Sequence, residues 1–408
     1  MDFSRPRLLV LASTFPRWKE DTEPRFVESL SFELADTFEV VVLVPHCLGS
    51  MQQETFTSKG RSIKVHRFRY FPAAMETLAY DGGMLSRVRS NPLRLLVLPF
   101  FLVAQAAAAL RLHREFGFDA VHAHWIVPQG FVASLLRVLW RRFPPVLVTS
   151  HGGDLYALRG YFLESLKRWI LARADGVTVV SNAMRDYCEK RRLARGKTIV
   201  QSMGVDLEAV FTPGDTESPR NGLIFVGRLV EKKGVEYLIE AMAILATDYS
   251  QTELTIVGDG PLREYLTNLA NTHGVSDRVR FLGSVVNEDV PGYLRAAAIF
   301  VMPSVVAASG DQEGLGLVAV EAQGCGCAVV ASDLPAVRDS VIDGQTGLMA
   351  KPADAADLAD KIRALLDDDT LRQSLAESGR RHAIEKFDWS KVGSMYSRII
   401  GELIAVAR

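Results

Sequence analysis

Two glutamates with seven residues between them stand in the stretch SGDQEGLGLVAVEAQGCG, Ser309–Gly326. The residues that separate Glu313 from Glu321 are small or apolar and carry no charge. Paired carboxylates first suggest the acid and base of a glycosidase, which flank one bond at about 5–9.5 Å. If a helix begins near Gly314, however, eight residues separate the two side chains by ~12 Å of rise. This spacing favours two anchors for one elongated ligand over a catalytic pair.

A basic stretch provides a second candidate site. In VGRLVEKKG, Val226–Gly234, Arg228 follows a predicted strand and Lys233 stands at the start of a predicted helix. Two positive charges beside a helix N-terminus suit the oxygens of a diphosphate. A solvated basic turn would produce the same pattern. The nearby VGDGPL, Val257–Leu262, lacks the third glycine of a dinucleotide fingerprint, so it predicts a tight strand-to-helix turn beside a ligand.

Three histidines follow or end predicted strands. His151 in VTSHGGD precedes two glycines that would let a ligand approach the backbone. The histidine is therefore a candidate to bind a sugar or to transfer a proton. A purely structural role is the alternative. His122 and His124 in VHAHW alternate with apolar residues and therefore share one face of a strand. No third ligand stands at metal spacing, so we assign them a structural or supporting role and expect no metal site.

Short, nearly continuous apolar runs alternate with helical patterns twice along the chain. Such runs are typical of parallel strands that are covered on both faces by helices. The pattern predicts an α/β protein with two tandem doubly wound domains, whose ligands bind in a cleft at the carboxyl ends of the strands. The predicted strands are Arg7–Ser13, Glu39–Pro45, Asp119–Trp125, Pro145–His151, Gly176–Ser181, Gly222–Gly227, Glu253–Gly258, Val279–Gly283, Ala298–Pro303 and Cys327–Ser332.

A stretch rich in Gly, Pro, Ser and Asp, Gln201–Gly222, marks the boundary between the domains. We expect a first domain over residues 1–203 and a second over residues 204–386. The C-terminal residues 355–408 are expected to be helical throughout. Their amphipathic end, residues 387–408, is predicted to pack back on the first domain.

Charge is divided unevenly along the 408 residues, although the net charge is only −1. Residues 1–205 contain 28 Lys and Arg against 18 Asp and Glu, an excess of 10 positive charges. A basic half indicates an anionic partner. Nucleic acid is disfavoured because no motif interleaves aromatic and basic residues. Four cysteines without a metal-ligand cluster fit a reducing cytoplasm, and the N-terminus lacks the cleavage site of a signal peptide.

One apolar segment, Pro92–Leu110, approaches the length of a membrane span. Arg94 and Gln105 interrupt it and Pro99 would kink it, which favours a buried or interface-seeking helix. A helix lying in an anionic membrane surface is the next alternative, because arginines precede the segment and the whole half is basic. A helix that spans the membrane is the third alternative.

Taken together, these motifs resemble glycosyltransferase family 4, the retaining enzymes of the GT-B fold with two Rossmann-like domains. The resemblance covers essentially the whole chain and is strongest over Asn221–Asp343. It includes GRLVEKKGVEYLIEA, LTIVGDGPLR, VRFLGSV and EGLGLVAVEAQGCGCAVVASDLPAVRDSV, and the two glutamates match the family's E-x(7)-E signature. SMGVD, Ser202–Asp206, resembles the hinge between the domains.

The resemblance implies a role for each matching position. Arg228 and Lys233 would bind the donor diphosphate, Glu313 the hydroxyls of the donor sugar, and Glu321 the ribose. The backbone of Gly314, Leu315, Gly316 and Leu317 would help to hold sugar and phosphate, and Leu282 and Gly283 would lie near the base. His151 would contact the donor sugar from the first domain. The side chains expected to act in the transfer step are His151, Glu313, Arg228 and Lys233.

The implied activity is transfer of a hexosyl group, with retention, from a UDP-, GDP- or other nucleotide sugar. The leaving diphosphate would take the acceptor's proton, so that no separate base, no metal and no cofactor is expected. The acceptor would be a glycan or a polyprenyl-linked intermediate of surface-polysaccharide synthesis. The enzyme would act in the cytoplasm, peripherally at the inner face of the plasma membrane. A GT-B-fold epimerase or phosphorylase and a non-catalytic nucleotide-sugar-binding protein remain as alternatives.

This chain departs from the family pattern in the loop after the first strand. Many members carry a Gly-Gly pair there, whereas STFPRWKEDTEPRF, Ser13–Phe26, contains no glycine. Arg17 and Arg25 are candidates to take its place near the phosphates or the acceptor.

Overall fold

The protein is represented by a computed structural model that describes residues 5–18, 21, 23–80, 83–194, 198–214 and 220–407. It consists of two compact units. One comprises Met1–Val180, Met184–Gln201 and Val392–Arg408, and the other Ser181–Ala183 and Ser202–Lys391. Residues 215–219 of the predicted boundary stretch, and residues 19, 20 and 22 of the first loop, lie outside the described part.

The first unit is built on a sheet with the strand order β3-β4-β2-β1-β5-β6-β7-β8. Its strands pair in parallel, except that β3 is antiparallel to β4. The direction in which the chain adds strands reverses between β1 and β5. Doubly wound sheets bind ligands at such a reversal, outside the carboxyl ends of the two strands. The bounds are β1 Arg7–Leu11, β2 Glu39–Pro45, β3 Gln53–Ser58, β4 Arg61–Phe68, β5 Ala120–His124, β6 Val146–Ser150, β7 Gly176–Val179 and β8 Ile199–Val200.

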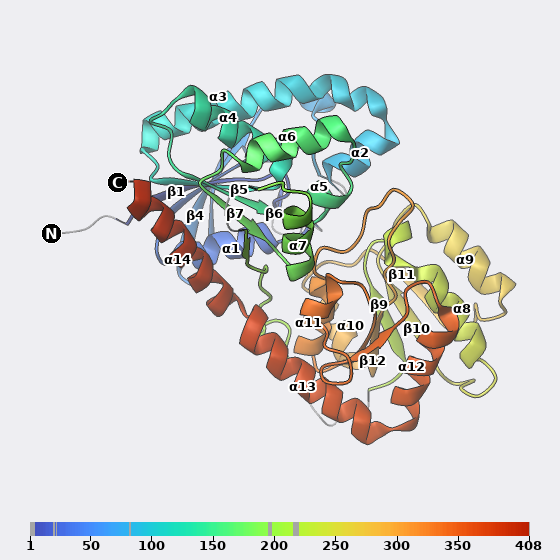
Figure 1. The fold of residues 1–408 in the computed structure, drawn as a ribbon. Helices are drawn as coiled ribbons and strands as arrows, with labels where there is room; N and C mark the ends of the chain where they lie inside the picture. Colours follow the sequence, from blue (N-terminus) through green and yellow to red (C-terminus); the bar gives the residue numbers. More distant parts are fainter. Residues whose placement is uncertain are drawn as a thin grey trace. The chain divides into compact units, whose positions relative to one another are not determined.

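Helices cover both faces of this sheet. In Figure 1, α3, α4 and α6 lie along one face, and α1 lies on the other, beside α14. Gly393 of α14 approaches α1 so closely that a Cβ added there would lie 2.5 Å from the Cβ of Glu33. The helix bounds are α1 Phe26–Leu34, α2 Met84–Ser90, α3 Leu98–Phe116, α4 Phe131–Leu139, α5 Gly153–Tyr156, α6 Tyr161–Leu171 and α7 Asn182–Lys190, with shorter turns η1 Ala73–Met75, η2 Pro92–Val97 and η3 Ile126–Gly130.

The second unit contains a parallel sheet of order β11-β10-β9-β12-β13-β14, which reverses between β9 and β12. Its strands are β9 Leu223–Val226, β10 Leu254–Val257, β11 Val279–Gly283, β12 Ile299–Met302, β13 Ala328–Ser332 and β14 Leu348–Ala350. Its helices are α8 Val235–Leu245, α9 Arg263–Thr272, α10 Val290–Ala296, α11 Leu317–Gly324, α12 Ala355–Asp367 and α13 Asp369–Phe387, with turns η4 Glu231–Lys233 and η5 Val337–Asp339. The expected α/β class with two Rossmann-like sheets is confirmed.

The second sheet separates two apolar cores because successive side chains of a strand point to opposite faces. Leu223 and Phe225 pack with α8, α9 and α12, whereas Ile224 of the same strand packs with α10 and α11. Each fully buried Leu, Ile or Phe contributes ~1.5–3 kcal/mol relative to an exposed one. Burial on both faces explains why these strands have continuous apolar sequences.

The C-terminal region is helical as expected, and two aspartates divide it into three helices. Asp368 separates α12 from α13, and its carboxylate accepts a hydrogen bond from the backbone N–H of Leu371 at 2.8 Å. Asp388 separates α13 from α14 (Trp389–Ala407) and accepts from the N–H of Ser390 at 2.9 Å. Aspartate favours such capping positions because its oxygen satisfies a free N–H of the first turn. Residues 392–408 belong to the first unit.

The sequence VGDGPL forms a tight turn whose glycines serve backbone contact. The N–H of Gly227 donates to Val257 O at 2.9 Å, so that the turns after β9 and β10 lie against each other. Gly258 has a φ of +132°, and a Cβ on it would lie 2.0 Å from Gly227 O. A Cβ on Gly260 would lie 2.4 Å from Leu229 O. The two glycines therefore bring the turn that carries Arg228 against β10.

We expect Gly258→Ala to destabilise the second unit by at least about 2 kcal/mol, from backbone strain and steric overlap with Gly227 O. Urea denaturation measures the change. Gly292→Ala is the matched control, because a Cβ at this position in α10 would meet no atom within 4 Å. It should be neutral or stabilising by roughly 0.5–1 kcal/mol. Equal stability of the two variants would contradict the packing argument.

Candidate functional site

The predicted donor residues of the second unit gather where its strand order reverses. Arg228 and Lys233 lie on the connection after β9, and Glu313 lies on the connection after β12. Because β9 and β12 are neighbouring parallel strands, both connections leave the same edge of the sheet. Leu282 and Gly283 end β11 at this edge. The N–H of Gly258 donates to Gly283 O at 2.8 Å and joins that end to the turn after β10.

Lys233 and Glu313 form an ion pair at the centre of this edge. The Nζ of Lys233 lies 2.8 Å from Oε1 of Glu313, whose residue is only 8% exposed. Burial alone would raise the pKa of Glu313, but the ammonium groups of Lys233 and Lys232 outweigh it and hold that pKa below its ordinary value. Glu313 is therefore a carboxylate, and hence a hydrogen-bond acceptor, at neutral pH.

Three further contacts hold the same two connections together. Lys232 forms a second ion pair with Asp311, at 3.3 Å. The carboxylate of Glu231 accepts a hydrogen bond from the N–H of Ala308 at 2.6 Å, and Lys232 O accepts one from the N–H of Val305 at 2.9 Å. The short turn Glu231–Lys233 thus fixes the loop that carries Glu313 through both side chains and backbone.

Helix α11 begins at Leu317, three residues later than expected. Gly314 and Leu315 belong to the loop, and Gly316 caps the helix with a left-handed φ of +84°. A Cβ at Gly316 would lie 2.9 Å from Cε of Met302. Our estimate of ~12 Å assumed one helix through both glutamates. That assumption is wrong, because Glu313 precedes the helix and Glu321 is its fifth residue.

The two glutamates have opposite electrostatic environments. Burial raises the pKa of Glu321 to about 7, and Lys233 opposes that rise only in part. Lys233 consequently acts on both carboxylates and pairs directly with Glu313. The site can present one ionised carboxylate, one carboxyl that titrates near neutrality, and the cations Lys233 and Arg228.

His151 belongs to the first unit and follows β6 directly. Its Nε2 lies 3.0 Å from Nδ1 of His124, the last residue of β5, and the two rings are stacked at 12°. The rings of Phe26 and Trp125 enclose His151 with centroids 4.9 and 5.0 Å away. Asp154 accepts hydrogen bonds from the N–H of His151 at 3.2 Å and of Ile126 at 2.7 Å. Contacts with His124, Phe26, Trp125 and Asp154 therefore fix the position of His151.

Burial keeps the three histidines neutral. It lowers the pKa of His122 and of His151 to about 3 and that of His124 well below its ordinary value. His122 Nε2 lies 2.7 Å from the hydroxyl oxygen of Thr149. A hydrogen bond between His124 and His151 needs one donor and one acceptor nitrogen, so two charged rings are incompatible with it. The supporting role predicted for His124 accords with this contact.

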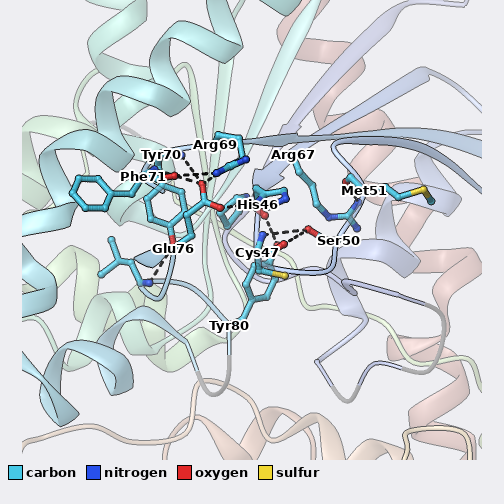
Figure 2. A network of polar contacts seen from close by, with 12 residues as sticks. His46, Cys47, Ser50, Met51, Arg67, Arg69, Tyr70, Phe71, Glu76 and Tyr80 are labelled. Carbon is cyan, nitrogen blue, oxygen red and sulfur yellow. Dashed lines mark hydrogen bonds and ion pairs between the residues drawn. The ribbon is translucent and has the colours of Figure 1, made fainter. Parts of the chain in front are cut away.

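A polar network at the ends of β2 and β4 was missed by the sequence reasoning (Figure 2). The side chain of Glu76 is fully buried. Its carboxylate accepts hydrogen bonds from the N–H of Tyr70 at 2.9 Å and from Nε of Arg69 at 3.0 Å. His46, which directly follows β2, places Nδ1 2.5 Å from the same carboxylate. The hydroxyl of Tyr80 donates to Pro45 O at 2.6 Å. The position of His46 after an apolar strand was the available signal.

Arg17, a candidate phosphate ligand in the first loop, is engaged by Asp21. Its Nε and Nη2 donate to the two carboxylate oxygens of Asp21, at 2.8 and 2.7 Å. Its guanidinium also lies over the rings of Trp18 and Tyr80, 4.6 and 5.4 Å from their centroids. Within the described residues, no group of three or more His, Cys, Asp or Glu side chains is arranged to hold a metal ion.

Family models account for nearly all of the chain. Residues 24–209 match the model described as Glycosyltransferase Family 4, and residues 211–382 match the model described as Glycosyl transferases group 1. The chain is 30% identical to a glycogen synthase of Mycobacterium tuberculosis, over 72% of this chain and 73% of that protein. It is 31% identical to a D-inositol 3-phosphate glycosyltransferase of Corynebacterium efficiens, over 74% of this chain and 76% of that protein.

Solved structures share the fold. The sucrose-phosphate synthase of Thermosynechococcus elongatus superposes with a TM-score of 0.80 at 24% identity, over 98% of this chain and all of that one. HepE of Anabaena, crystallised with UDP-glucose, superposes with a TM-score of 0.68 at 18% identity, over 97% of this chain and 99% of that one. At these identities the likeness concerns the fold.

We expect Glu321→Gln to change how stability depends on pH. The folded state raises the pKa of Glu321, so its stabilising contribution is present below the unfolded pKa near 4.5 and is lost as pH rises through about 7. The free energy of unfolding of the variant should therefore increase relative to that of the wild type between about pH 5 and about pH 8. The increase should stay below roughly 3 kcal/mol, because the side chain is only partly hidden from solvent. Urea denaturation at several pH values measures the difference, and the exposed Glu385→Gln serves as the control. A pH-independent difference would show that Glu321 titrates normally.

We expect His122, His124 and His151 to stay neutral from about pH 8 down to about pH 5, where a free imidazole would already be protonated. Their folded pKa values are depressed, so the stability they contribute is present above about 6.5 and is lost as pH falls. Nitrogen chemical shifts of the histidine rings, measured by NMR in the folded and urea-unfolded protein, report the protonation. Titration of these three rings near 6.5 in the folded protein would contradict the prediction.

Proposed function

The chain belongs to the group 1 and family 4 glycosyltransferases of the GT-B fold, and from this premise we propose that it is a retaining hexosyltransferase. It takes the sugar from a nucleotide-diphosphate donor and transfers it to a glycan or polyprenyl-linked acceptor of polysaccharide synthesis. The observation that carries the proposal is the ion pair between Lys233 and Glu313 at the reversal between β9 and β12. It places a cation for phosphate and an anion for sugar hydroxyls at one point.

Each role in donor binding is supported by the chemistry of the residue. Arg228 and Lys233 bind the diphosphate, and the N–H groups of the loop from Gly314 to Leu317 add donors at the start of α11. Ionised Glu313 accepts hydrogen bonds from the sugar hydroxyls. The ribose hydroxyls bind Glu321, and the base lies beside Leu282 and Gly283, where backbone amides provide the contacts. His151, held neutral, contacts the donor sugar through its ring.

In the transfer step, the acceptor hydroxyl oxygen forms a bond to the anomeric carbon on the face from which the diphosphate leaves. The bond between that carbon and the diphosphate oxygen breaks, and the hydroxyl proton passes to that oxygen. Lys233 and Arg228 stabilise the negative charge that develops on the diphosphate. The two cations and the loop N–H groups meet this charge, so we propose that the step needs neither a metal nor another cofactor. Retained activity in the presence of a chelator tests that part.

We place the reaction in the cytoplasm, at the inner face of the plasma membrane where polyprenyl-linked acceptors are available. All four cysteines are free and buried, as expected for a reducing compartment. Thermal-shift measurements with UDP-, GDP-, ADP- and TDP-sugars can identify the donor. A donor at 100 times its Kd stabilises the folded state by ~2.7 kcal/mol.

We expect Glu313→Gln mainly to lower kcat, because the neutral amide leaves Lys233 without its counter-charge and stabilises the sugar less in the transition state. Glu321→Ala should mainly raise the Kd of the free nucleotide, because it removes the ribose contact. Steady-state kinetics and calorimetry with the nucleotide separate the two effects, and Glu385→Gln should change neither. Equal loss of nucleotide affinity in both site variants would contradict this division of roles.

A further inference from the structure

An exposed apolar surface covers the start of α3 and the turn before it. We call it the apolar ledge and define it by Leu93, Leu95, Leu96, Phe100 and Val103. Leu93, Leu96 and Val103 are each 70% exposed. Single exposed apolar residues are ordinary, but five large ones within eleven residues of sequence are typical of an interaction site.

The opposite face of the helix that carries the ledge packs against the core of the first unit. An 18-residue window of Pro92–Phe116 has a mean hydropathy of 2.0, and the segment is long enough to cross a membrane, yet Phe101, Ala109 and Leu112 are completely buried in the first unit. A helix with one face fixed in a protein core cannot be surrounded by lipid. This geometry fits a helix that lies flat in an interface with its free apolar face immersed.

The segment of sequence that carries the ledge has charges of one sign. Residues 82–114 contain five arginines and no aspartate or glutamate. Arg94 donates through Nη1 to Arg87 O at 2.6 Å and to the Ser90 hydroxyl at 2.7 Å, which fixes its guanidinium at the junction of α2 and η2. Arg89 is exposed on the same α2. A second copy of the chain would bring like charges together in a symmetric contact, whereas an anionic surface would be attracted.

The ledge is joined to the carboxyl edge of the first sheet. The ring of Phe100 lies 5.3 Å from that of Phe71, in the loop after β4, and Arg87 Nε donates to Thr77 O in the same loop at 3.0 Å. Buried Glu76 holds this loop next to His46 (Figure 2). Ligands of doubly wound sheets bind at this edge, so whatever the ledge contacts is brought close to a binding edge of the unit.

We propose that the apolar ledge, with Arg87, Arg89 and Arg94, docks the protein on the surface of a bilayer that bears anionic lipids. The leucine, phenylalanine and valine side chains enter the region between headgroups and acyl chains, and the arginines bind the headgroup phosphates. The inference rests on the proposed function only in that a polyprenyl-linked acceptor would be reached from this surface.

Co-sedimentation with vesicles tests the proposal on the full chain. Wild-type protein should bind vesicles of phosphatidylcholine with phosphatidylglycerol in low salt, and should bind vesicles of phosphatidylcholine alone at least roughly tenfold more weakly. A triple variant, Leu93→Ser with Leu96→Ser and Val103→Ser, should reduce binding by roughly tenfold or more. Arg89→Glu removes one positive and adds one negative charge, so at ~5-fold per charge it should reduce binding by roughly 25-fold.

Ile244→Ser is the matched control, because Ile244 is 42% exposed on α8 of the second unit and should not affect vesicle binding. Circular dichroism establishes that each variant is folded. Absence of wild-type binding to anionic vesicles in low salt overturns the proposal, as does a triple variant that binds like the control. So does a wild-type dimer, seen by light scattering, that the triple variant dissociates. The thermal shift with nucleotide sugars is read separately, so its failure bears on the proposed function alone.

Discussion

The candidate donor site depends on one buried ion pair, between Lys233 and Glu313. Burying an isolated carboxylate is costly, and it persists as an anion here because two lysines of a single turn face it. The same turn fixes the loop after β12 through Asp311 and through backbone contacts. The connections after β9 and β12 are therefore ordered before a ligand arrives. A diphosphate would then share Lys233 with Glu313, and little conformational entropy would remain to be lost on binding.

Identical residue types acquire different chemistry from their surroundings. Glu313 lies in the loop against two ammonium groups and stays ionised, whereas Glu321 lies within α11, where burial dominates and brings its pKa to about 7. The environments of the two glutamates thus shift their pKa values in opposite directions. In the first unit, burial without a counter-charge lowers the pKa of His151 and likewise keeps the side chain neutral. Charge at these sites is a property of the fold and not of the residue type.

Sequence reasoning predicted the features that depend on local pattern. Five strands of each sheet were found because strands buried on both faces are continuously apolar, and Glu39–Pro45 and Val279–Gly283 have the bounds expected. The short strands β8 and β14 were not predicted. The hairpin of β3 and β4 was missed because β3, QETFTS at a sheet edge, is polar except for Phe56, although Lys59-Gly60 signalled a turn. The start of α11 was misplaced because a left-handed Gly316 is indistinguishable in sequence from a helical one. Glu76 and His46, thirty residues apart, meet only through tertiary packing.

Different interactions order the carboxyl edges of the two sheets. At the reversal of the second sheet, oppositely charged side chains from two connections form the ion pairs that order a site for an anionic ligand. The corresponding edge of the first unit is ordered by neutral stacked rings around His151 and, beside β2, by the buried carboxylate of Glu76. Glu76 also accepts from the N–H of Tyr70, whose ring lies 5.1 Å from that of Phe101 in α3. Glu76 thus fixes the backbone of the residue whose ring contacts α3, and it thereby connects α3 with the strand ends. The exposed face of α3 and the carboxyl edge of its sheet are consequently linked by contacts within the first unit.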